Sequence, residues 1–161
     1  MTEAVRLHAQ NLTAEAFAPF GFVFDLPRDA NRTGPHAVFA DDRPDATVTT
    51  TLIHLKPAKH PRTVIDVERH RHSAQFFLPL SGARLSVVVF PSDATGRPDE
   101  TAARAFLVGP GLAFGYHPGT WHAGVAATNE PASVASLLSR NGSASDVEET
   151  KLAHVLEIAW T

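Results

Sequence analysis

Short apolar or alternating segments dominate the chain from Val48 onward. Most are five to nine residues long and rich in Val, Ile, Phe and Thr, side chains that pack well on a pleated strand. Their sequences are VTTTLIHL, RTVIDVERH, AQFFLPL, RLSVVVF, RAFLV, LAFGYH, HAGVAA, ASVASLL and AHVLEIAW. Turn-forming pairs such as Ser81-Gly82 and Pro118-Gly119 separate the segments at a regular spacing. The pattern therefore predicts an all-β barrel or sandwich.

Four segments have other predictions. Thr13 can cap a short helix over residues 14–17, because its hydroxyl can accept a free amide of the first turn. Residues 25–46 mix Pro, Gly, Asp and Arg without a period, which indicates a long surface loop. Residues 146–152 are expected to form one or two helical turns. The apolar run of residues 153–160 could add an outer strand or pack against a partner subunit, but most of its residues are expected simply to pack in the core.

The composition favours one globular domain, residues 1–161, that acts on a small molecule. A chain of 161 residues with 43% hydrophobic residues can bury a core of useful size. Its formal net charge of -3, without runs of like charge, argues against nucleic acid or an anionic membrane as a partner. The sequence has no cysteine, which excludes disulfides and thiolate chemistry, and its first residues lack the pattern of a signal peptide. We therefore expect a cytoplasmic protein.

A first cluster of candidate functional residues lies around His70. In a strand, His70 and His72 project to the same face, close enough to bind one ion or one substrate. Gln75 has the opposite parity and could join them only through a bulge or bend in the chain. Glu68 and Arg69 fit an ordinary surface charge pair. The alternative for the two histidines is that both are solvated and have no function.

A second cluster, residues 116–122, surrounds a Pro-Gly turn. The turn predicts a hairpin with His117 and His122 at its two ends, where both could face one cavity. Trp121 could form an apolar wall of that cavity. Tyr116 and the histidines supply groups that can give and take a proton near neutral pH. The alternative is an aromatic turn that closes the end of a barrel.

The spacing of the two clusters resembles the paired signature of cupins. The matching residues are His70-x-His72-x-x-Gln75-x6-Gly82 and Gly111-x5-His117-Pro118-Gly119-x-x-His122. The resemblance implies an all-β, cupin-like double-stranded β-helix (jelly-roll) barrel with one or two short helices. Imidazole nitrogens and an amide oxygen suit Ni, Mn, Zn or Fe, so a divalent metal could be bound. Its expected ligands are His70, His72, Gln75 and His122. No organic cofactor is expected.

At a finer level the chain is similar to the ureidoglycolate lyase family. The matching stretches are Leu12-Thr13-Ala14-Glu15-Ala16-Phe17-Ala18-Pro19-Phe20-Gly21, Glu68-Arg69-His70, Gln75-x-Phe77-Leu78-Pro79-Leu80-x-Gly82, Arg104-Ala105-Phe106 and Tyr116-His117-Pro118-Gly119-Thr120-Trp121-His122. The resemblance implies cleavage of ureidoglycolate to glyoxylate and urea, in allantoin and purine degradation, by a homodimer. The family usually has Pro-Leu-Gly after the Arg-His pair, whereas this chain has Arg71-His72-Ser73. A metal role for His72 therefore depends on the cupin spacing alone.

This reaction would give the candidate residues distinct roles. A base must remove the hydroxyl proton of the substrate, and an acid must protonate or stabilise the leaving nitrogen. We expect His117 or His122 as the base, and Tyr116 or the other histidine as the acid. Arg69 could bind the substrate carboxylate and Gln75 the ureido group. Two alternatives remain, a metal-dependent cupin enzyme for another small carboxylic acid and a non-catalytic cupin that binds a metabolite.

Overall fold

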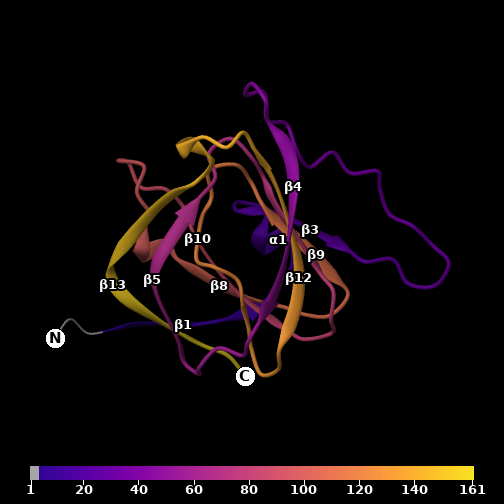
Figure 1. Ribbon diagram of the computed structural model, residues 1–161. Helices are drawn as coiled ribbons and strands as arrows, with labels where there is room; N and C mark the ends of the chain where they lie inside the picture. The colour runs from indigo at the N-terminus through magenta and orange to yellow at the C-terminus, as the bar shows by residue number, and fades with distance from the viewer. Residues whose placement is uncertain (1–3) are drawn as a thin grey trace.

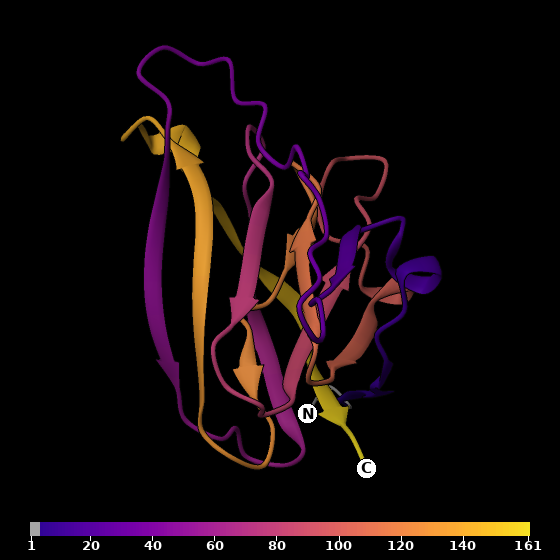
Figure 2. The ribbon, with the colours of Figure 1, turned by 90° about the vertical axis from the view of Figure 1, so that its right-hand side faces the viewer.

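The computed structural model describes residues 4–161 and shows two β-sheets packed face to face (Figures 1 and 2). The large sheet has the order β1 (Val5–His8), β13 (Glu148–Ala159), β5 (Arg62–Arg69), β10 (Trp121–His122), β7 (Leu85–Phe90), β8 (Arg104–Val108) and β2 (Gln10–Asn11), with β11 (Ala126–Ala127) paired to β7. The small sheet has the order β3 (Gly21–Asp25), β9 (Leu112–Tyr116), β6 (Gln75–Pro79), β12 (Ala132–Arg140) and β4 (Thr47–Leu55). The prediction of an all-β barrel-like fold is confirmed.

The large sheet curls until it nearly closes on itself. Strands β1 and β2 are separated only by Ala9, yet β1 pairs with β13 at one end of the sheet and β2 pairs with β8 at the other. The concave side of this curl holds one core, which includes Phe90, Trp121, Leu156 and Ile158. Near-closure leaves little unpaired strand edge in this sheet.

The opposite face of the large sheet packs against the small sheet. This second core contains Val87 and Val89 from β7, and Phe77, Phe114 and Tyr116 from the small sheet. Side chains alternate along a strand, so β7 contributes to both cores and all of its residues are buried. The buried residues of β5, β10 and β7 therefore face either the space between the sheets or the inside of the curl.

The helical predictions had mixed outcomes. The helix α1 (Ala14–Phe17) is confirmed, and the Thr13 hydroxyl accepts a hydrogen bond from the Ala16 N–H at 3.2 Å. The helix expected over residues 146–152 is wrong, because only the 3-10 turn η2 (Ala144–Asp146) forms and β13 follows it. Pairing with β5 along most of its length favours the strand over an isolated turn of helix. A second 3-10 turn, η1, spans Glu100–Ala102.

The structure agrees with the loop predicted over residues 25–46 and with the strand predicted near the C-terminus. Residues 26–46 have no helix or strand and extend away from the sheets as the purple trace in Figure 1. Residues 153–159 belong to β13, as expected of a strand. Within residues 4–161, none of the helices has the length and apolar character needed to span a membrane.

Candidate functional site

Both predicted clusters lie where the chain crosses from one sheet to the other. Residues 70–74 join β5 of the large sheet to β6 of the small sheet, and residues 117–120 join β9 of the small sheet to β10 of the large one. The Gly119 N–H donates a hydrogen bond to the His70 carbonyl at 2.7 Å, which holds the two crossings together. Gly119 has a φ of 83°, a conformation that favours glycine. The predicted hairpin over residues 117–122 is wrong, because β9 and β10 belong to different sheets.

Three side chains with metal-binding atoms converge at this junction. Glu68 and His122 are direct partners in the β5–β10 pairing, so both side chains point to the same face of the large sheet. The Glu68 Oε1 lies 3.6 Å from His70 Nε2 and 3.5 Å from His122 Nε2. The potential ligand atoms of the three residues all lie within 4.8 Å of one another.

Backbone carbonyls fix the protonation of both imidazole rings. The Nδ1 of His70 lies 2.8 Å from the Asp146 carbonyl oxygen, and the Nδ1 of His122 lies 2.9 Å from that of Thr120. A carbonyl oxygen can only accept, so each Nδ1 carries the proton and, in the neutral ring, each Nε2 is left with a lone pair. Both lone pairs therefore face the region beside the Glu68 carboxylate.

Four buried polar atoms in this region lack a hydrogen-bond partner among the residues that the structure describes. They are His70 Nε2, Gln75 Oε1, Tyr116 Oη and His122 Nε2. The Tyr116 and His122 rings stack with their centroids 4.1 Å apart, and Gln75 is the pairing partner of Tyr116 between β6 and β9. Buried polar atoms are nearly always hydrogen-bonded in proteins, so four such atoms at one place indicate a site that a ligand completes.

Burial and charge set the ionisation of the site. When protonated on Nε2 as well, the facing rings of His122 and His70 hold the pKa of Glu68 well below its usual range. Burial lowers the pKa of His122, which favours the neutral ring. Burial raises the pKa of Tyr116 far above its usual range, so this hydroxyl keeps its proton. The site thus offers a carboxylate, imidazole lone pairs and a neutral hydroxyl.

This donor set fits a divalent transition metal. Two imidazole nitrogens and one carboxylate oxygen are ligands used by Fe, Mn, Ni and Zn. The second nitrogen of each ring is already held by a backbone carbonyl, as in metal-binding histidines generally. A cation would also give partners to the two Nε2 atoms that lack one.

A cavity gives access to the carboxylate. It has a volume of about 480 Å³ and is lined by Asp66, Val67, Glu68, Gly124, Glu149, Thr150 and Lys151. Most of these residues belong to β5 and β13, whose neighbouring position is visible in Figure 1. Glu68 belongs to both the cavity and the three-residue cluster, so the cavity borders the cluster.

Two of the predicted substrate-binding residues lie on the other face of the large sheet. Arg69 donates from Nε to a Glu148 carboxylate oxygen at 3.0 Å, and its guanidinium lies 4.4 Å from the centre of the Trp121 ring. The Trp121 indole N–H donates to the Gly96 carbonyl at 3.1 Å. Strand alternation explains this placement, since Arg69 follows Glu68 and Trp121 precedes His122.

Two of the predicted histidines are not brought into the cluster. The side chain of His72 is exposed, because β5 ends at Arg69 and the strand parity expected for residues 70 and 72 does not apply. His117 is also exposed, and its Nε2 lies 3.0 Å from the Ala18 carbonyl oxygen. In their place, the structure adds Glu68 to the cluster.

The sequence contains a signal for Glu68. Glu68 precedes His70 by two positions, the same spacing that made His70 and His72 candidates. Its assignment to a surface charge pair with Arg69 ignored that adjacent strand residues face opposite sides. The contact between His70 and the Asp146 carbonyl had no such signal, since 76 positions separate the two residues.

Comparisons with known proteins agree with the resemblance found in the sequence. The chain is 33% identical over 162 residues to a ureidoglycolate lyase of Mesorhizobium japonicum, covering 95% of this chain and 97% of that protein. It is 34% identical over 155 residues to a ureidoglycolate lyase of Rhodobacter capsulatus, covering 91% of this chain and 94% of that protein. A solved dTDP sugar isomerase from Desulfovibrio desulfuricans has a TM-score of 0.48 and 20% sequence identity, covering 81% of this chain and 82% of that one. The family model for ureidoglycolate lyase matches residues 4–159, and the chain belongs to the ureidoglycolate lyase family.

Proposed function

We propose that the protein cleaves ureidoglycolate to glyoxylate and urea at the cluster of Glu68, His70 and His122, as a step of allantoin and purine degradation. The observation that carries this proposal is the set of buried polar atoms without partners around the Glu68 carboxylate, in a member of the ureidoglycolate lyase family. A structural cluster would satisfy these atoms within the protein.

The chemistry of the substrate matches the groups present. Ureidoglycolate has a hydroxyl and a ureido nitrogen on the same carbon, so loss of the hydroxyl proton lets a carbonyl form while the carbon–nitrogen bond breaks. The lone pair on His122 Nε2 can take that proton, because the Thr120 carbonyl holds the ring with Nδ1 protonated. The same proton can then pass to the leaving nitrogen, which balances the reaction and returns His122 to its neutral form.

Tyr116 and Gln75 are suited to bind the ureido group. The Tyr116 hydroxyl keeps its proton because burial raises its pKa, so it acts as a hydrogen-bond donor to the ureido oxygen. Gln75 donates from Nε2 to the Ser136 hydroxyl at 3.1 Å, which leaves its Oε1 free to accept an N–H of the substrate. The proposal gives no substrate contact to Arg69, Trp121 or His117, because of their placement.

A divalent metal at Glu68, His70 and His122 is the alternative form of the proposal, in which the Nε2 lone pair of His122 binds the metal and does not take the proton. Bound there, Ni, Mn, Zn or Fe would bind the substrate hydroxyl and lower its pKa. The donor set also supports a second candidate function, a metal-dependent enzyme for another small carboxylic acid.

The test is release of urea and glyoxylate from ureidoglycolate by the purified protein. It is run on the protein as prepared, after EDTA treatment, and after addition of Ni²⁺ or Mn²⁺. His70→Ala should abolish turnover, and His72→Ala is the matched control because His72 is an exposed histidine two positions away. Loss of turnover with EDTA and recovery with a metal would support the metal site, whereas unchanged turnover would favour His122 as the base. If no urea or glyoxylate is released under any condition, ureidoglycolate is not the substrate. That result would favour a metal-dependent enzyme for another small carboxylic acid.

We also propose that the protein is a cytoplasmic homodimer. The absence of cysteine from the sequence supports the location. Val48 and Leu52 support the dimer, since they are 49% and 74% exposed on the edge strand β4 of the small sheet. Size-exclusion chromatography with light scattering should give twice the chain mass, and Leu52→Glu should give the monomer mass.

A further inference from the structure

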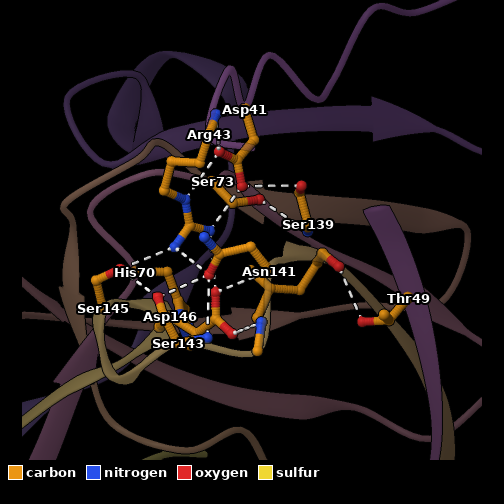
Figure 3. Close-up of polar contacts among 12 residues, drawn as sticks. Asp41, Arg43, Thr49, His70, Ser73, Ser139, Asn141, Ser143, Ser145 and Asp146 are labelled. Atoms are coloured by element: carbon orange, nitrogen blue, oxygen red, sulfur yellow. Dashed lines mark hydrogen bonds and ion pairs between the residues drawn. The ribbon is translucent and has the colours of Figure 1, made fainter. Parts of the chain in front are cut away.

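The end of the long loop is anchored in the protein through Arg43. Residues 26–46 have no regular structure, yet the side chain of Arg43 is only 11% exposed and that of Asp41 only 1%. Figure 3 shows the Arg43 side chain pointing to the turn that contains Asn141 and Asp146, and the Asp41 carboxylate pointing to Arg43 and Ser139. Such burial of charged groups is costly unless every one of them is paired.

The Arg43 guanidinium makes four hydrogen bonds and one further ion pair. Its Nε and one Nη2 hydrogen bind the two Asp41 carboxylate oxygens at 2.9 and 2.7 Å. The Nη2 atom also forms an ion pair with an Asp146 carboxylate oxygen, 3.0 Å away. The Nη1 hydrogens bind Asn141 Oδ1 at 3.2 Å and Ser145 Oγ at 3.0 Å. Only the planar guanidinium can make this set of contacts, since a lysine has three donors on one atom.

Asp146 connects this network to the candidate site. Its carboxylate accepts hydrogen bonds from the N–H groups of Asn141 and Gly142 at 3.0 and 2.8 Å, in addition to Arg43. Its backbone carbonyl accepts from His70 Nδ1 at 2.8 Å. The same residue therefore receives the guanidinium on its side chain and the imidazole on its backbone, as Figure 3 shows.

We propose that Arg43 is a positioning residue that holds the Asp146 carbonyl against His70, and so keeps the Nε2 of His70 unprotonated and directed at the site. The expected effect of this inference on kcat rests on the proposed function. The link between Arg43 and the His70 tautomer does not depend on which substrate the protein uses. The loop over residues 26–46 thereby contributes to the site without contacting it. The network gives the loop a role beyond a connection between strands.

A second branch of the network reaches the same crossing of the chain. The Ser139 hydroxyl donates to Asp41 at 2.9 Å, and the Ser139 N–H donates to the Ser73 hydroxyl oxygen at 3.0 Å. Ser73 lies in the crossing that begins at His70. Arg43 is therefore coupled to this crossing through Asp146 and through Asp41.

The test compares Arg43→Met and Arg43→Lys with Arg32→Met. Arg32 lies exposed on the same loop, so its substitution is matched in chemistry and in loop position. We expect Arg43→Met to lower kcat by about 10–100-fold with KM changed by less than about threefold, because His70 of the cluster is misplaced while the groups proposed to bind the ureido group stay in position. Arg43→Lys should recover only part of kcat, and Arg32→Met should match the wild type.

A spectroscopic measurement separates this proposal from the proposed function. The ¹⁵N chemical shifts of His70 in the full-length protein, treated with EDTA, should report the Nδ1-protonated ring in the wild type and in Arg32→Met. They should report a mixture of both neutral tautomers in Arg43→Met. If ureidoglycolate is not a substrate, this result still supports the positioning role. A folded Arg43→Met protein with an unchanged His70 tautomer overturns the positioning role of Arg43. If Arg43→Met does not fold, the His70 tautomer is measured in Arg43→Lys and judged by the same criterion.

Discussion

The two faces of the large sheet differ in how their buried polar groups are satisfied. On the face toward the small sheet, Glu68 and His122 meet beside atoms that have no partner among the described residues. On the face inside the curl, the neighbouring residues Arg69 and Trp121 are joined to each other, to Glu148 and to the Gly96 carbonyl. The same two strands therefore carry a reactive face and a structural face, one residue apart. Substitutions on the first should change activity and substitutions on the second should change stability.

The largest expected effect follows from Glu68→Gln. The amide has the same shape but no charge, so it binds a cation less tightly and cannot balance the charge of a protonated imidazole. We expect kcat for urea and glyoxylate release to fall by about 10²–10⁴-fold, with little change in Tm. Retention of more than about a tenth of the activity would place the reaction away from this face.

The reverse result is expected for Trp121→Phe. This change removes the hydrogen bond to Gly96 and leaves space in the core inside the curl. The free energy of unfolding should fall by about 1–3 kcal/mol. Denaturant unfolding measures this loss, and kcat of the folded variant should stay within about threefold of the wild type. A large loss of kcat with unchanged stability would contradict the division between the two faces.

A smaller effect, and one that depends on pH, is expected for Glu148→Gln. Arg71 and Arg69 lower the pKa of Glu148 from its ordinary value of 4.5 to about 2. Because this pKa is depressed in the folded state, the interaction stabilises the protein above pH 4.5 and is lost as the pH falls from 4.5 to about 2. The variant should therefore be less stable than the wild type at neutral pH, and the difference should shrink through this window. Denaturant unfolding at several pH values measures it, and a difference that does not change with pH would assign the effect to packing.

The sequence was sufficient for the class of fold and for part of the site. Short runs rich in β-branched and aromatic residues, separated by turn residues, are local signals, so they predicted an all-β fold. The resemblance carried by Tyr116–His122 indicated the family. Which sheet each strand joins depends on pairing between distant segments, and for this reason the expected hairpin over residues 117–122 was wrong. The network of Arg43 and Asp146 joins positions about a hundred residues apart, and no local pattern reports such a contact.

The smallest effect is expected for His117→Ala, and it tests whether a histidine beside the site shares in the reaction. His117 is five positions from His122 and precedes the Pro-Gly turn, yet its ring is exposed and its Nε2 contacts the Ala18 carbonyl. This contact links the crossing to the segment after α1, so its loss should lower Tm slightly, in keeping with one exposed hydrogen bond. We expect kcat to change by less than about twofold, because no group of His117 faces the cluster. If His117→Ala lowered kcat as much as His122→Ala, the reacting groups would extend beyond this face of the large sheet. The comparison between the two faces would then no longer describe where the chemistry occurs.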